Sequence, residues 1–371
     1  MKIIERLLYL LFICPSGQIL AQDGCSNELI MQVNGSWKKI SDANLKWTRD
    51  QTAILSRIDQ ISVFFKDAYP QPKGIEASWY RTMTGYPLTE NGPIPYDFNS
   101  LYKAWYCNQN LHKMMPGDET GTWAYVYVNT FNNFLSNQYD QLQIQSQGNP
   151  IYLLPRKIGE WKGYNLFECS AWPGKNHCIL LTHNDRLPWK PVSEEQYLKA
   201  VRLGLEDQKS KSSGDDALQE ENIKKSMADN QNNQYIKDAD KTRINASLQK
   251  RLDDMQKSRG ANSATMNRYW DDKIAKIDDY VRKNSSSTLV QPAIIDQKIA
   301  GSFDGNFSTI EKGGRMLVVV SQEYVNTRLP NYVPQLMILL WRWDNNMPVQ
   351  EFKKQFEANF PVEKLKAMLD K

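Results

Sequence analysis

Residues 178–207 constrain the fold more than any other stretch, because they fix how three elements follow one another. Cys178-Ile-Leu-Leu-Thr182 is a short apolar run rich in branched residues, which predicts a buried strand. Two prolines force an extended link over 187–191, since each fixes its own φ and disfavours helix in the residue before it. Ser193-Glu-Glu-Gln196 matches a capping box, so a helix is expected to start there. A strand, a rigid link and a fixed helix start indicate a framework rather than a reaction centre.

The segment Leu187–Leu198 reads L-P-W-K-P-V-S-E-E-Q-Y-L. It resembles the motif L-P-(W/Y)-x-P-V-(S/T)-x-x-x-Y-L of an uncharacterised family of secreted bacterial proteins. Further segments that are similar to that family are 68–74, 161–164, Leu329-Pro330 and Pro334-Gln335. The resemblance implies export and a similar layout over most of the chain. It implies no activity, no cofactor and no site residues.

The N-terminus carries the pattern of a secretory signal peptide. Two positive residues in 1–6 precede an apolar run over 7–14, and Ala21 offers a small residue for cleavage. The run is shorter than the roughly 20 residues that cross a bilayer. We therefore expect residues 1–21 to be removed, leaving a soluble exported protein, periplasmic or extracellular, with no transmembrane segment. A net charge of +4 over 371 residues gives no reason to expect a nucleic acid partner.

Four cysteines follow that segment, and an even number in an oxidising compartment permits two disulfides. Cys169 and Cys178 flank a Pro-Gly turn, so a β-hairpin would bring them together and favour a bridge between them. Cys25 and Cys107 would form the other pair. None of the four has the C-x-x-C spacing of a zinc site, and no metal is expected.

Residues 22–207 predict a first lobe that mixes strands and helices. A capping-box pattern over 48–51 precedes a helical apolar stripe that stops before Pro70. Residues 122–130 alternate with period two and predict a strand. Strands outnumber helices and show little βαβ rhythm, which favours an α+β lobe over a doubly wound sheet.

Residues 208–288 predict a long, charged helical insertion. Lys, Asp, Asn, Gln and Ser dominate its first part, and breaks are expected at 211–214 and 258–263. Sparse apolar stripes favour a helical hairpin, which is either a solvated spacer or a coiled segment that binds a partner. Disorder over 208–234 is a third alternative.

Residues 289–371 predict a second, small α+β lobe. Strands are expected at 315–320 and 336–343, and Val349, Phe352, Phe356 and Phe360 recur at helical spacing. The fold class is therefore α+β, with two mixed α/β lobes joined by a long helical insertion.

The sequence contains none of the motifs that identify common catalytic or cofactor sites. Its three histidines form no H-E-x-x-H pattern, and there is no G-x-S-x-G elbow or phosphate-binding glycine loop. No cofactor is expected, and the sequence leans away from an enzyme. Eleven tryptophans are the compositional oddity, since exposed aromatic rings bind glycans or proteins. Trp172 and Trp189, in predicted turns, and Arg186 are the candidate ligand-binding residues.

These observations predict an exported, non-catalytic binding or scaffolding protein whose partner is a protein or a glycan. The alternative is an exported hydrolase that acts on glycan or peptide through acidic residues. Spacing alone does not identify such acids.

Overall fold

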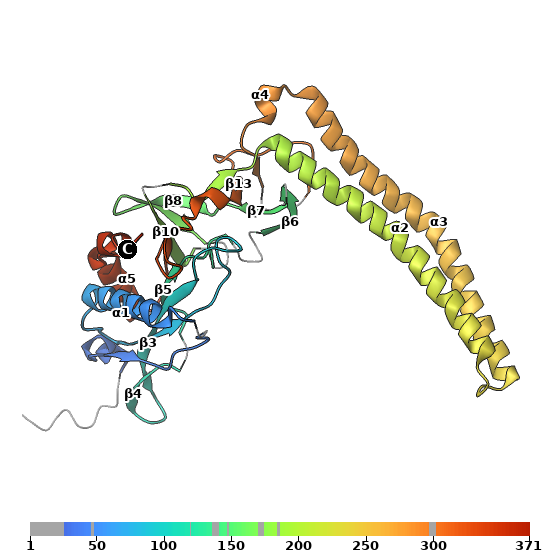
Figure 1. Cartoon of the computed structure of the whole chain (residues 1–371). Coiled ribbons are helices and arrows are strands. Elements are labelled where there is room, and N and C mark those ends of the chain that lie inside the picture. Colours follow the sequence, from blue (N-terminus) through green and yellow to red (C-terminus); the bar gives the residue numbers. More distant parts are fainter. Residues whose placement is uncertain are drawn as a thin grey trace, which may run out of the picture. The chain divides into compact units, whose positions relative to one another are not determined.

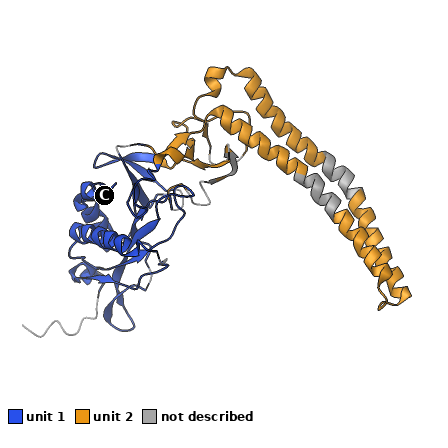
Figure 2. Cartoon of the chain, in the orientation of Figure 1, with its two compact units in different colours: residues 1–132, 157–186, 325–371 blue, residues 133–156, 187–324 orange. Residues whose placement is uncertain are grey.

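The chain forms two compact units in the computed structural model (Figure 2). Unit 1 comprises residues 1–132, 157–186 and 325–371, and unit 2 comprises residues 133–156 and 187–324. Both helices and mixed sheets are present, so the predicted α+β class is confirmed. The described residues are 26–45, 48–118, 120–135, 141–146, 148–169, 174–183, 186–296 and 302–371. The predicted signal peptide, residues 1–21, lies outside them.

Unit 1 is built on a nine-stranded sheet with the order β1-β2-β3-β5-β14-β10-β9-β8, in which β4 pairs with β3. β1 runs parallel to β2, whereas the pairs from β2 through β3, β5, β14 and β10 to β9 are antiparallel. The strands are β1 (Trp37–Lys39), β2 (Ile75–Thr82), β3 (Tyr96–Asn108), β4 (Lys113–Pro116), β5 (Trp123–Val128), β8 (Arg156–Trp161), β9 (Tyr164–Glu168), β10 (Asn176–Thr182) and β14 (Leu336–Arg342). The helices are η1 (Asn27–Gln32), α1 (Gln51–Ala68), α5 (Met347–Asn359) and α6 (Val362–Lys366).

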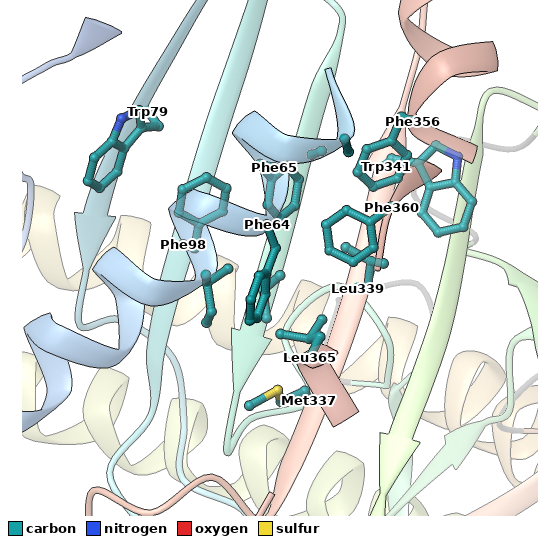
Figure 3. Packing of buried hydrophobic residues seen from close by; sticks show 14 of the residues in the cluster. Phe64, Phe65, Trp79, Phe98, Met337, Leu339, Trp341, Phe356, Phe360 and Leu365 are labelled. Carbon is teal, nitrogen blue, oxygen red and sulfur yellow. The ribbon is translucent and has the colours of Figure 1, made fainter. Parts of the chain in front are cut away.

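One face of this sheet packs against α1, α5 and α6 to form the main core (Figure 3). Strand alternation places every second side chain on that face, and antiparallel register puts Val126 of β5 opposite Leu339 of β14. Phe65 of α1 meets Phe356 of α5 with ring centroids 5.5 Å apart. Unit 1 therefore has a wide aromatic core between a sheet and a helical layer.

Unit 2 combines a five-stranded sheet with two long helices (Figure 1). The sheet order is β11-β13-β7-β6, and β12 pairs with β13. Its strands are β6 (Gln141–Ser146), β7 (Asn149–Leu153), β11 (Trp189–Pro191), β12 (Ile294–Ile295) and β13 (Arg315–Val320). Its helices are α2 (Glu194–Asn232), α3 (Asp238–Lys283), α4 (Ser286–Leu289) and η4 (Gln322–Tyr324).

The two long helices form an antiparallel hairpin, which we call the arm: α2, α3 and the connecting residues 233–237 (Figure 1). With 39 and 46 residues they are roughly 58 and 69 Å long at the rise of an α-helix. At its base the arm packs on the sheet of unit 2, where Tyr197, Val201 and Ile277 share a core with Leu153 and Leu317. The base is thus anchored by apolar burial.

The units do not coincide with the predicted lobes. The predicted second lobe, 289–371, is divided between them, because β14 lies between β5 and β10 in the sheet of unit 1. Residues 187–207, placed in the first predicted lobe, belong to unit 2. Pairing between strands far apart in the chain decides this division, and local sequence patterns do not report it.

Two predicted helix breaks are wrong. The backbone is helical through 211–214 in α2 and through 258–263 in α3. A glycine inside a helix costs only about 1 kcal/mol relative to alanine, so helix pairing outweighs it. The disorder alternative for 208–234 is wrong too, since α2 continues to Asn232. The arm turns at 233–237 instead.

Of the two predicted capping boxes, one is confirmed. The Gln196 amide donates to Ser193 Oγ at 3.2 Å, and the Ser193 amide donates to Gln196 Oε1 at 2.9 Å. The box at 48–51 is wrong, because α1 begins only at Gln51 and its cap residue, Asp50, makes no side-chain capping bond.

Candidate functional site

The structure describes two of the three predicted ligand-binding residues. Trp172 lies outside the described residues. Arg186 is exposed, and its amide donates to the His183 carbonyl at 2.9 Å. Trp189 lies in β11 and is only 6% exposed, with its ring stacked on Phe134 at 5.8 Å. The expectation that Trp189 is exposed is therefore wrong, because strand pairing with β13 turns the ring into the core.

The structure brings the two sulfur atoms of the predicted cysteine pair close together. The Sγ atoms of Cys169 and Cys178 lie 2.8 Å apart, and the structure holds no disulfide between them. Cys107 is disulfide-bonded, whereas its predicted partner, Cys25, lies outside the described residues.

The arm consists of two long helices, and few of its described apolar side chains are buried between them. In its outer half Ile223 and Leu252 are buried, and Met227, Leu248 and Met255 are half-buried. Their spacing of three to four residues follows one stripe along each helix. The stripe is sufficient to pair the helices but leaves their other faces in solvent.

Polar contacts between the helices complete the pairing. The Lys209 ammonium lies 2.6 Å from Asp271 Oδ1, and Gln256 donates to Glu220 Oε1 at 3.1 Å. Such exposed pairs contribute less than about 1 kcal/mol each. They define which residues face each other without adding much stability.

Asn230 is a buried polar residue of the outer arm, with 8% of its surface exposed. Its amide group donates to Asn245 Oδ1 at 2.7 Å and to the Lys241 carbonyl at 3.3 Å. Asn245 donates in turn to Gln231 Oε1 at 2.9 Å. A buried polar residue of this kind fixes the register of paired helices, because a shifted alignment leaves its donors without acceptors.

Tyr235 occupies the turn of the arm and is 98% exposed. Its amide donates to Asn233 Oδ1 at 2.9 Å, which shapes the turn. The turn between α2 and α3 lies at the end of the arm that is distant from the sheet of unit 2 (Figure 1).

Other apolar side chains are exposed along the arm. Leu203 lies on α2, and Met266, Tyr269 and Val281 lie on α3. Tyr269 contacts the neighbouring Trp270 edge to face at 4.8 Å, and the Lys273 ammonium lies 5.7 Å from its ring centre. These contacts are within α3 and leave half of the Tyr269 side chain accessible.

Unit 1 contains a carboxylate that accepts from two aromatic residues. Trp341 Nε1 donates to Glu357 Oε1 at 2.9 Å, and His177 Nδ1 lies 3.1 Å from the same oxygen. Burial favours the neutral acid, but these bonds and the Lys353 charge outweigh it and hold the pKa of Glu357 below its usual value. Because one oxygen serves both donors, the cluster ties α5 to β10 and β14, and we interpret it as structural.

A second carboxylate of unit 1, Asp97 of β3, is 1% exposed. One of its oxygens accepts from Thr82 and Thr84, each at 2.6 Å. Its other oxygen has no hydrogen-bond partner among the described residues. Burial raises the pKa of Asp97 to about 6, although the two hydroxyl groups act against this shift. Because ionising this buried carboxyl group is costly, we expect the free energy of unfolding to depend on pH through Asp97.

Within the described ranges, no group of three or more His, Cys, Asp or Glu side chains is arranged to hold a metal ion. The same part of the chain contains no helix that is both long and apolar enough to span a bilayer. Comparisons with protein-family models, with curated proteins and with solved structures found no match. The resemblance to secreted bacterial proteins stays a prediction.

Sequence reasoning missed both Tyr235 and Asp97. Asn232-Asn-Gln-Tyr235 between two helical segments is a turn signal, but exposure of the ring depends on both helices continuing to that point. For Asp97 the signal was the alternation of Tyr96 and Phe98 with polar neighbours, which is typical of a strand.

Proposed function

We propose that this protein is a non-catalytic binding or scaffolding protein that contacts a partner protein with the turn of its arm. The observation that carries the proposal is the 98% exposure of Tyr235 at the end of two helices of 39 and 46 residues. An exposed ring contributes almost nothing to folding, since it removes no apolar area from water. We expect the Tyr235 ring to contribute free energy only when a partner covers it.

The length of the arm supports the same proposal. Only its base shares the core of unit 2, so the outer half is not needed to complete that core. Each additional residue must be ordered, at a cost of about 1–2 kcal/mol in backbone entropy. A long arm with an accessible surface of mixed polarity is suited to contacting a partner along its length.

A protein partner fits this surface better than a polyanion. The chain carries a net charge of +4 over 371 residues, which is too small to attract nucleic acid strongly. Tyrosine is enriched among the residues that dominate protein–protein binding energy.

Two exposed tyrosines in different units give a matched test. Tyr235 and Tyr86 are 98% and 79% exposed, and Tyr86 lies in unit 1. A photo-crosslinking amino acid replaces either tyrosine in the full chain, and each variant is expressed in the organism that naturally produces the protein. We expect an adduct of one discrete size from position 235 and none of that size from position 86.

The protein identified in that adduct is then purified and titrated against the full chain. Tyr235→Ala should weaken binding at least about tenfold, the effect of a single dominant contact residue. Tyr86→Ala should leave the affinity unchanged. Equal affinity of both variants and the unaltered chain, or no discrete adduct from position 235, contradicts the proposal.

We also propose that the protein acts outside the cytoplasm. The charged start, apolar run and small residue of positions 1–21 support export, as does the resemblance of Leu187–Leu198 to secreted proteins. Fractionation should find the chain in the periplasm or medium, starting near residue 22. A full-length cytoplasmic chain would contradict export while leaving the proposal for the arm intact.

An exported hydrolase stays the competing prediction. A hydrolase would have its catalytic acidic residues in the sheet regions rather than in the arm. A variant in which α2 and α3 are shortened by matched segments would then keep hydrolytic activity. The binding proposal predicts that the same shortened chain loses its partner.

A further inference from the structure

We infer that Cys169 and Cys178 are oxidised to a disulfide that closes the β9–β10 hairpin at the edge of the unit 1 sheet. The Sγ atoms lie 2.8 Å apart. This is closer than two sulfur atoms rest without bonding and within a small movement of the roughly 2.05 Å of an S–S bond. Both residues are wholly buried, so no water or outside group separates them.

The hairpin holds the two residues in place. Cys178 of β10 pairs with Phe167 of β9, which puts Cys169 opposite Asn176, two positions nearer the turn. Asn176 holds the backbone of Cys169 from both sides: its Oδ1 accepts from the Cys169 amide at 2.7 Å, and its Nδ2 donates to the Cys169 carbonyl at 3.0 Å. The approach of the two sulfurs is thus a consequence of strand register and of a buried polar clamp.

The bond would secure the sheet edge. β9 and β8 lie beyond β10 in the strand order, and β10 is held from its other side by seven residues of pairing with β14. A covalent link from Cys169, directly after β9, to Cys178 of β10 therefore fixes the outer two strands to the strand that β14 already anchors.

The oxidant required is a small-molecule or protein disulfide. One cysteine thiolate attacks a sulfur of that disulfide and releases one thiol, which leaves a mixed disulfide on the chain. The second cysteine then attacks the chain sulfur of the mixed disulfide and releases the second thiol. Two thiols of the protein lose two electrons and two protons, and the oxidant becomes two thiols. Because both residues are wholly buried, the exchange takes place before the hairpin packs or while it opens.

Tryptic peptides give a direct test. The full chain is reduced, unfolded and then refolded in the presence of oxidised glutathione, so that both thiols are accessible before the hairpin packs. It is then denatured at low pH, alkylated and digested. Cys169 falls in the peptide 163–175, Cys178 in 176–186 and Cys107 in 104–113. We expect 163–175 and 176–186 to be joined and to separate on reduction. Recovery of both as alkylated thiols overturns the inference, as does a link from either to 104–113.

The double variant Cys169→Ser/Cys178→Ser controls for the bond of Cys107. Reduction should lower the Tm of the unaltered chain by several degrees more than that of the double variant, because only the former has a bond to lose at this hairpin. An equal shift in both chains would contradict a role of the bond in holding the sheet edge.

Discussion

The core of unit 1 and the outer arm of unit 2 differ in how much apolar surface each of them buries. In unit 1 a sheet and three helices enclose a layer of aromatic side chains, among them Phe65, Phe98 and Phe356 (Figure 3). In the outer arm the buried apolar side chains that the structure describes are Ile223 and Leu252. A wide core makes unfolding cooperative, whereas a narrow seam lets a segment open on its own. We therefore expect unit 1 to unfold cooperatively and the outer arm to open locally at a lower free energy.

The largest effect is expected in the core. Phe356→Ala removes a ring that is 1% exposed and packs against Phe65, Phe360 and Trp341. We expect a loss of about 3–5 kcal/mol in the free energy of unfolding, from transfer and cavity terms together. Denaturant titration followed by tryptophan fluorescence measures it.

Val63→Ala is the control for that substitution, because Val63 lies on α1 with its side chain half exposed. A loss below about 0.5 kcal/mol is expected there. Equal losses in the two variants would contradict a wide core.

The second effect concerns Asp97 and depends on pH. Its pKa is about 6 in the folded chain, whereas the ordinary pKa of an aspartic acid side chain is 3.8. A raised carboxyl pKa means that the folded state binds the proton more tightly, so stability falls as pH rises from about 4 to 6 and stays low above. At 1.36 kcal/mol per unit, the cost of the charge is about 3 kcal/mol.

Asp97→Asn removes this titration. The unfolding free energy of the unaltered chain, minus that of the variant, should decrease by roughly 2.5 kcal/mol between pH 4 and pH 7, because a small part of the full change has already occurred at pH 4. Chemical denaturation at a series of pH values gives both curves. If the difference in unfolding free energy between the two chains does not change with pH, the pKa of Asp97 is not raised in the folded state.

In the arm a comparable large-to-small change should do less and act locally. Leu252 is 5% exposed, but its seam has solvent on both sides. Leu252→Ala should cost about 2 kcal/mol, the low end for such substitutions, because water and neighbouring side chains fill the space. Hydrogen exchange of α3 amides should accelerate while the unfolding midpoint of unit 1 stays unchanged. Ile244→Ala, which truncates a side chain that is 37% exposed, is the control and should leave exchange nearly unaltered.

The smallest effect is expected at Asn230. Asn230→Ala removes donors to Asn245 and Lys241, and should cost about 1 kcal/mol. Circular dichroism at rising temperature would show earlier loss of helix. Asn222→Ala, on the exposed side of α2, should have no such effect. If the two variants melt alike, the register role of Asn230 is refuted.

Much of the local structure could be predicted from sequence. The strand patterns at 122–130, 315–320 and 336–343 correspond to β5, β13 and β14, and the phenylalanine spacing to α5. The cap at Ser193 was also predicted, since it depends on residues three apart. These features are determined by neighbours in the chain.

What failed depends on distant residues. Gly214 and Gly260 suggested helix breaks, but each helix is supported by the other and continues past them. Trp189 was expected in an exposed turn, yet pairing with Val320 buries it. The exposure of Tyr235 likewise follows from where both helices end. Burial and exposure are tertiary properties, and this is why the candidate site was found only in the structure.

Native-state hydrogen exchange in low denaturant tests the central claim, an arm that opens independently of a stable core. Amides of Ile223 and Leu252 should exchange through local opening, with free energies several kcal/mol below those of Val126 and Leu339 and little dependence on denaturant. Exchange of all four amides with the same free energy and the same denaturant dependence would contradict it, because arm and core would then unfold as one.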